Sequence, residues 1–144
     1  MALAFAVGTF SFAQKKEFKT AEKAIKNKDF NSAKTALNTI EPMLGSLDED
    51  LKEKYYYLHS VALFANGKGE YGDVTKALEE IDMVGNSYKK EVNDFKYLMT
   101  GDFLKKANAH YENKKYKPAS LFFERAYDVN EKDTVYLYYA AATA

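Results

Sequence analysis

Two histidines, His59 and His110, are the side chains best suited to proton transfer or metal binding, because imidazole titrates near neutral pH. Either role needs a second group in reach, and no spacing in the sequence fixes a carboxylate or another ligand beside them. His59 follows three tyrosines (55–57) on a predicted helix and is interpreted as a packed or surface residue. His110 is interpreted as a core residue. With no cysteine and only two histidines, we expect no catalytic residue, no metal ligand and no cofactor.

Acidic pairs and a glycine-rich segment are the other candidates for chemistry. Glu79 and Glu80 could act as paired acids, but neighbouring carboxylates on an amphipathic helix usually form a solvated face, and that is our interpretation. Residues 48–50 lack the spacing and the glycine of a calcium loop. Residues 67–72 lack the preceding strand and the Lys-Ser/Thr ending of a phosphate loop, and are interpreted as a turn. The sequence therefore predicts a protein that is not an enzyme.

Charge and composition exclude further classes. Lys+Arg and Asp+Glu both number 21, so the formal net charge is zero, whereas a nucleic-acid binder carries a basic excess. The lysine pairs at 89–90 and 114–115 are short and flanked by acids, so no nucleic-acid partner is expected. Seven glycines and two prolines are few for an all-β domain, which needs many tight turns.

The first 13 residues carry no charge, and residues 2–7 are apolar. Ser11 and Ala13 are small residues at −3 and −1 of a cleavage point before Gln14, as at the end of a secretory signal peptide. The stretch is too short to span a membrane as a helix, and no basic residue precedes it. We expect residues 1–13 to be the end of a signal peptide, with a buried N-terminal helix as the alternative.

The remaining sequence predicts helices throughout. Lys, Glu, Ala and Leu are strong helix formers, and apolar residues recur at every third or fourth position. Ser46 opens a capping-box pattern, and Asp73 and Asp133 are expected to cap two later helices. Gly101 lies inside a long predicted helix, and Pro118 is tolerated in a first turn. The expected helices cover residues 17–27, 31–43, 46–65, 73–81, 92–111, 118–129 and 133–144.

Three segments share one spacing of small and aromatic residues. A small residue, Ala21 or Ala107, precedes an aromatic residue by nine positions, and a second alanine follows three positions later. A middle unit around Ser60 carries a degenerate form of the pattern with a two-residue insertion. Small residues at a crossing let two antiparallel helices approach closely. One helix pair cannot bury its own apolar faces, so the pairs must stack.

This spacing resembles the tetratricopeptide repeat (TPR), although the period exceeds the usual length of about 34 residues. The resemblance implies an all-α fold in which antiparallel helix pairs stack as a TPR-like right-handed α-solenoid. Residues 14–144 would form about three repeats plus the first helix of a fourth, truncated repeat. The matching residues are Ala107, Tyr116, Ala119, Phe123 and Ala126 in the third unit, and Ala21, Phe30, Ala33 and Leu37 in the first, where Ile40 replaces the last alanine.

The resemblance also implies a function. TPR domains are non-enzymatic protein–protein interaction scaffolds that bind a peptide or protein partner in a concave groove. The chaperone-tail clamp of the family is not matched, because Phe18 and Glu22 occupy its positions in the first repeat. The groove positions of the family also include Phe18, Val61 and Leu104 of this chain. From the groove positions of the family, we nominate these partner-binding residues: Glu22, Lys26, Tyr57, Phe64, Asn108, Tyr111 and Glu112.

The chain has 12 tyrosines, with clusters at 55–57 and at 136, 138 and 139. Tyrosine suits such a surface, because it exposes an apolar body and a polar tip. The alternative is that these aromatic residues only pack between helices. A signal segment before lysine-rich degenerate repeats resembles the exported TPR proteins of Bacteroidota, which implies a periplasmic or outer-membrane-associated location.

The alternative function is a structural or oligomerising N-terminal segment of a larger exported protein. The last predicted helix is apolar almost all round between residues 135 and 144. Such a helix must be buried on more than one side. We therefore expect a partner for it, which is either the second helix of a fourth repeat or another subunit that self-associates through this helix.

Overall fold

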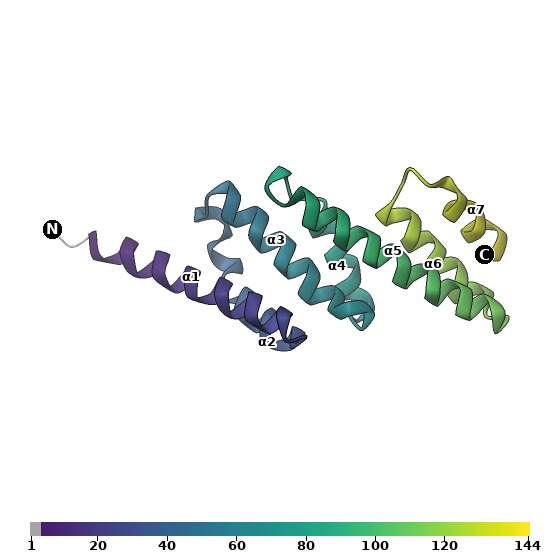
Figure 1. The fold of residues 1–144 in the computed structure, drawn as a ribbon, viewed down its shortest axis with the longest axis horizontal. Coiled ribbons are helices and arrows are strands. Elements are labelled where there is room, and N and C mark those ends of the chain that lie inside the picture. Colours follow the sequence, from purple (N-terminus) through teal and green to yellow (C-terminus); the bar gives the residue numbers. More distant parts are fainter. Residues whose placement is uncertain (1–3) are drawn as a thin grey trace. The chain divides into compact units, whose positions relative to one another are not determined.

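The computed structural model describes residues 4–144, with side chains described from Gln14 onward. This part of the chain contains helices and turns and no strand (Figure 1), so the predicted all-α class is confirmed. The α-helices are α1 (Ala4–Lys26), α2 (Phe30–Asn38), α3 (Glu49–Phe64), α4 (Tyr71–Ile81), α5 (Lys89–Glu112), α6 (Tyr116–Val129) and α7 (Thr134–Thr143). The 3₁₀ helices are η1 (Glu41–Ser46), η2 (Ala65–Gly67) and η3 (Asn86–Tyr88).

The chain forms two compact units, an N-terminal unit (Met1–Lys89) and a C-terminal unit (Lys90–Ala144). In the N-terminal unit, α1 packs on α2, α2 on α3, and α3 on α4. Fully buried alanines lie along these contacts, and a small side chain there lets two helices approach closely. The alanines with no exposed surface are Ala21, Ala33, Ala62 and Ala77, and the largest buried side chains include Phe18, Leu37, Ile40, Tyr55, Phe64 and Ile81.

The C-terminal unit packs α6 against α5 and α7. Ala107 of α5 and Ala119 of α6 are both fully buried, and they share a core cluster with Phe123 and Ala140. The Ser120 hydroxyl donates a hydrogen bond to the Ala140 carbonyl oxygen at 2.8 Å, which ties α6 to α7. Ala107 and Ala119 are the small residues that the repeat pattern placed at helix crossings.

Two predicted helix boundaries are wrong around Pro42. Helix α2 ends at Asn38 rather than near residue 43, because proline has no amide hydrogen to continue the α-helix, and η1 follows instead. Ser46 belongs to η1, where its hydroxyl donates to the Met43 carbonyl oxygen at 2.8 Å. The α3 cap is therefore Asp48, whose carboxylate accepts the Leu51 amide hydrogen at 2.9 Å.

The two other predicted caps have different outcomes. Asp133 caps α7 by accepting the Val135 amide hydrogen at 3.2 Å, as predicted. Asp73 is not a cap, because α4 already begins at Tyr71. The Asp73 carboxylate lies in the first turn and pairs with the Lys34 ammonium at 2.9 Å.

Helix α1 continues through the predicted cleavage point before Gln14. Met1–Leu3, at the start of the predicted signal segment, lie outside the described residues. The described buried side chains of α1 are Phe18, Ala21 and Ala24, all beyond Gln14. Within residues 4–144, no helix has the length and apolarity required to cross a membrane.

Candidate functional site

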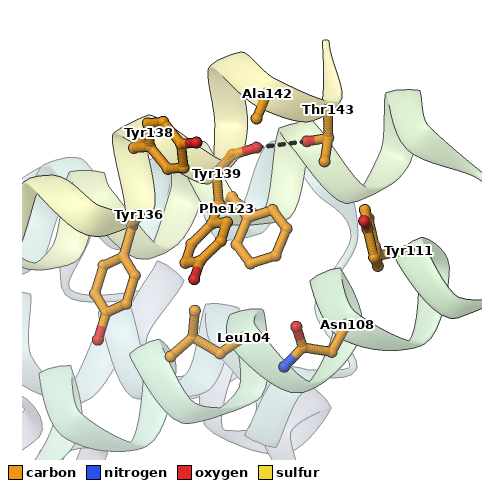
Figure 2. Close-up of a pocket in the computed structure, with 9 residues that line it drawn as sticks. All are labelled: Leu104, Asn108, Tyr111, Phe123, Tyr136, Tyr138, Tyr139, Ala142 and Thr143. Carbon is orange, nitrogen blue, oxygen red and sulfur yellow. Dashed lines mark hydrogen bonds between the residues drawn. The ribbon is translucent and has the colours of Figure 1, made fainter.

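The C-terminal unit contains a groove of about 590 Å³ between α5 and α7, which we call the tyrosine groove (Figure 2). Five of its lining residues are aromatic, and none is charged. Leucine, alanine, asparagine and threonine complete the walls. The lining residues are Leu104, Asn108, Tyr111, Phe123, Tyr136, Tyr138, Tyr139, Ala142 and Thr143.

Helical spacing builds the α5 wall of the tyrosine groove. Leu104, Asn108 and Tyr111 follow one another at intervals of four and three residues, which places them on one face of the helix. Phe123 of α6 is only 6% exposed and packs against the Tyr139 ring, with centroids 5.4 Å apart. The groove therefore has an aromatic base held by the core.

The rings above this base are accessible. Tyr111 is 52% exposed, Tyr138 70% and Tyr139 47%. Burial, with the charge of Asp133 and a hydrogen bond to it, raises the pKa of Tyr136, so this phenol stays protonated at neutral pH. The groove thus offers apolar faces, hydroxyl groups and the Asn108 amide, and selects an occupant by shape and hydrogen bonding rather than by charge.

The structure distributes the nominated partner-binding residues unevenly. Asn108 and Tyr111 line the tyrosine groove, whereas Glu112 is exposed and does not line it. In the N-terminal unit, Lys26 is exposed, and the Glu22 carboxylate lies 2.7 Å from the Lys54 ammonium.

Two nominated aromatic residues of α3 have packing roles. Tyr57 is half-buried and stacks on Tyr88, with centroids 5.4 Å apart. Phe64 is 1% exposed, so the expectation that it faces a partner is wrong. The repeat pattern is degenerate in this middle unit, and the family register carried over there points a core residue outward.

The tyrosines of α7 were not nominated, although they form much of the groove. The family positions were carried over only onto the three earlier first helices, so α7 contributed no residue. The signal was the tyrosine cluster itself, because three tyrosines within four positions cannot all pack inward on one helix.

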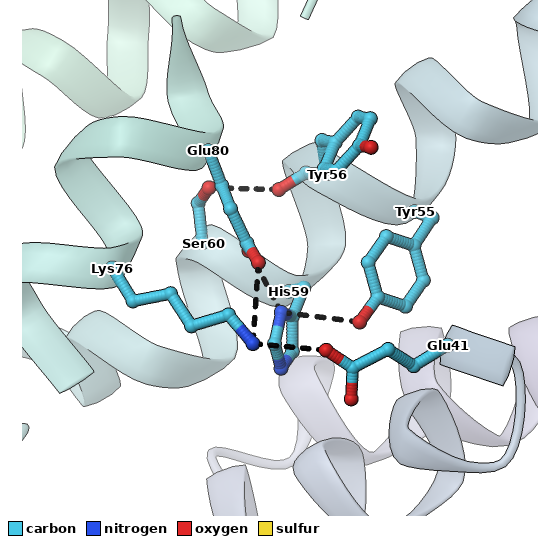
Figure 3. A network of polar contacts seen from close by, with 7 residues as sticks. All are labelled: Glu41, Tyr55, Tyr56, His59, Ser60, Lys76 and Glu80. Atoms are coloured by element: carbon cyan, nitrogen blue, oxygen red, sulfur yellow. Dashed lines mark hydrogen bonds and ion pairs between the residues drawn. The ribbon is translucent and has the colours of Figure 1, made fainter. Parts of the chain in front are cut away.

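A second cluster lies in the N-terminal unit, where His59 and Glu80 form a buried pair (Figure 3). His59 is 2% exposed and Glu80 5%. The His59 Nδ1 atom lies 2.7 Å from Glu80 Oε2, and the Tyr55 hydroxyl is 3.4 Å from the same nitrogen. The Lys76 ammonium lies 3.7 Å from Glu80 Oε1 and 3.0 Å from Glu41 Oε1.

This cluster corrects the interpretation of Glu80 as part of a solvated face. It also supplies the carboxylate that the sequence left unassigned beside His59. Glu80 is three residues after Ala77 and directly before Ile81, both of which are buried. The position of Glu80 on the buried face of α4 is the sequence feature that could have predicted its burial.

The pairing with Glu80 orients the His59 ring. An ionised carboxylate only accepts hydrogen bonds, so Nδ1 carries the hydrogen, and Nε2 is an acceptor in the neutral ring. Burial, with the charges of Glu41 and Glu80, raises the pKa of Tyr55, which therefore stays a neutral phenol. A neutral ring could accept a hydrogen bond at Nε2.

His110, the other histidine, stacks on Phe122 with centroids 5.5 Å apart and an interplanar angle of 5°. Within the described residues, no group of three or more His, Cys, Asp or Glu side chains could hold a metal ion.

Comparison with known proteins finds no matching family model, no similar curated protein and no similar solved structure. The fold and the sites therefore define the class: an all-helical protein with an uncharged aromatic groove in one unit and a buried histidine–glutamate pair in the other.

Proposed function

We propose that this chain is a non-enzymatic protein–protein interaction scaffold built of TPR-like repeats stacked as an α-solenoid. The turns of the first and third units support the repeat. Lys28 and Lys114 occupy the same repeat position and are both left-handed, with φ of 60° and 57°. After each lysine, the next amide donates the hydrogen bond to the carbonyl oxygen five residues earlier that defines a Schellman motif. These bonds run from the Asp29 amide to the Ala24 oxygen and from the Lys115 amide to the His110 oxygen, both at 2.9 Å.

The observation that carries the function is the tyrosine groove. Its two long walls come from α5 and α7, which the repeat pattern makes the first helices of successive repeats. An uncharged aromatic groove with hydroxyl and amide groups suits a peptide, which presents apolar side chains and backbone hydrogen-bonding groups together. We infer that the occupant is a peptide segment of a partner protein, anchored by tyrosine rings.

A first prediction tests this function. We expect Tyr111→Ala to weaken binding of a peptide selected from a display library by about tenfold, which corresponds to about 1.4 kcal/mol. Stability should change little, because Tyr111 is 52% exposed. Fluorescence anisotropy measures the affinity, and thermal melts measure the stability.

The matched control is Tyr97→Ala. Tyr97 is also a tyrosine of α5, is 85% exposed and does not line the groove. The control should bind like wild type. Equal binding by the Tyr111 and Tyr97 variants would remove the groove as the binding site.

Export to the periplasm or outer-membrane surface is part of the proposal. It is supported by the uncharged segment 1–13 and the small residues before Gln14. The described core of α1 lies beyond Gln14, so cleavage there leaves Phe18, Ala21 and Ala24 in place. A second prediction follows: mass spectrometry of protein from the native host should find Gln14 as the first residue. A mature chain that keeps Met1 would contradict export by this segment.

The alternative function, a structural or oligomerising segment of a larger exported protein, is favoured by one observation. Val135 and Leu137 of α7 are 51% and 45% exposed. Exposed aliphatic side chains on one helix favour association with another apolar surface. The two functions therefore differ in the face of α7 that meets a partner.

A further inference from the structure

The N-terminal unit contains a second groove, of about 570 Å³, which we call the polar groove. Helices α2 and α4 supply its two sides, η1 adds Glu41, and α3 adds His59. Most of its lining side chains carry charges, amides or hydroxyls, in contrast to the tyrosine groove. It shares no residue with the proposed peptide site.

His59 lines this groove, and its Nε2 atom makes no hydrogen bond to the described residues. The ring is 2% exposed, and its Nδ1 is held by Glu80. Figure 3 shows the second ring nitrogen on the side away from Glu80, and among the described residues no hydrogen bond reaches it. Nε2 is not among the buried polar atoms that lack a partner, so it is open to the groove, where a ligand that donates a hydrogen bond can reach it.

Two ion pairs join the sides of the polar groove with opposite polarity. The Lys34 ammonium of α2 lies 2.9 Å from the Asp73 carboxylate of α4. The Glu41 carboxylate of η1 lies 3.0 Å from the Lys76 ammonium of α4. The four side chains are 31–47% exposed, and exposed ion pairs contribute little to stability. A ligand can therefore exchange its own charges for these contacts.

We propose that the polar groove binds a small zwitterion of the free amino-acid class. The ligand ammonium donates to His59 Nε2 and lies near the carboxylates of Asp73 and Glu41. The ligand carboxylate accepts from the Lys34 and Lys76 ammonium groups. A ligand with one sign of charge would meet as many like charges as opposite ones on these sides. A zwitterion matches both signs at once.

The two histidines make the test direct, because His110 lies in the other unit and serves as an internal control. The full chain, labelled at its histidine rings, is titrated with each standard amino acid in turn, and the imidazole signals are followed by NMR at constant pH and ionic strength. We expect at least one amino acid to shift the His59 signals saturably and to leave the His110 signals unchanged. Sodium acetate, methylammonium chloride and sodium phosphate should bind at least tenfold more weakly.

A double variant tests the sides of the groove. Lys34→Gln with Asp73→Asn removes one cross-groove pair without leaving an unpaired charge, and should raise the apparent Kd at least tenfold. Lys90→Gln with Asp94→Asn removes an exposed pair of α5 and should leave the Kd unchanged. The proposal is overturned if no amino acid shifts the His59 signals saturably, if acetate or phosphate binds equally well, or if the Lys34/Asp73 variant binds like wild type. If that variant does not fold, the wild-type titration decides alone.

Discussion

The buried pair of His59 and Glu80 links α3 to α4 through a hydrogen bond that each side chain requires. The Nδ1–Oε2 distance is 2.7 Å, and neither side chain is more than 5% exposed. Removing one partner leaves the other buried without its hydrogen bond, which costs more than the bond itself contributes. We therefore expect the pair to be a sensitive point of the N-terminal unit.

A third prediction tests this pair. Glu80→Leu keeps a side chain of similar size but cannot accept the His59 hydrogen, so the free energy of unfolding should fall by about 2–3 kcal/mol. Glu79→Leu is the matched control, because Glu79 is the exposed neighbour on the same helix. Urea denaturation followed by circular dichroism measures both variants. Coincident midpoints would show that the buried pair does not stabilise the unit.

Single residues were predictable where one physical demand decided their place. Ala21, Ala107 and Ala119 are buried, as predicted from the need for a small side chain where two helices cross closely. Glu80 was not predictable in the same way, since its burial depends on the histidine facing it from α3, 21 positions earlier in the chain. The prediction for Phe64 failed for a different reason. The family register placed Phe64 in the groove, although its hydrophobic side chain favours burial, and it is 1% exposed.

At the scale of elements, the turns after α1 and α5 use lysine where glycine is the favoured residue. Lys28 and Lys114 are left-handed, with φ of 60° and 57°. This conformation places the Cβ atom of an L-residue close to the following carbonyl oxygen, at a cost of about 1–2 kcal/mol. Glycine adopts it without that strain, and is the usual residue at this position of a Schellman motif.

A fourth prediction follows for these turns. Lys114→Gly should raise the free energy of unfolding by about 1 kcal/mol, because the relief of strain exceeds the loss of chain entropy. Lys105→Gly is the control within α5, and should lower the same quantity by about 1 kcal/mol, since Lys105 is exposed inside the helix. Thermal melts of the two variants should shift in opposite directions. A shift in the same direction would contradict the left-handed turn.

Helix positions were predictable because apolar residues recur with helical spacing, but helix ends were not always so. At α7 one candidate, Asp133, preceded the apolar run, and it is the cap. Before α3 the predicted cap was Ser46, but η1 takes up Ser46, and Asp48 is the cap instead. A local motif therefore predicts an end well only where no second element competes for the same residue.

At the scale of the molecule, the predicted all-helical class is confirmed for residues 4–144. The two candidate sites lie in different units. The tyrosine groove lies wholly in the C-terminal unit, and the polar groove wholly in the N-terminal unit. The resemblance to the repeat family predicted one wall of the tyrosine groove, through Asn108 and Tyr111. It could not predict the other wall, because that wall depends on how α7 packs onto α6.

The last prediction concerns the exposed face of α7. Val135 and Leu137 should drive self-association as concentration rises, because burying aliphatic surface between two chains is favourable. Multi-angle light scattering of the chain should therefore show a mass that increases with concentration. Replacing both residues by lysine should hold the mass at that of the monomer, 16.4 kDa.

The control places two lysines on α5 instead, at Tyr97 and Leu98, which are 85% and 45% exposed. It adds the same charge but leaves α7 unchanged, so its mass should follow that of wild type. If the control also becomes monomeric, added charge rather than the α7 face explains the effect. A wild-type mass that stays monomeric at every concentration would remove the oligomerising alternative and leave peptide binding in the tyrosine groove as the proposed function.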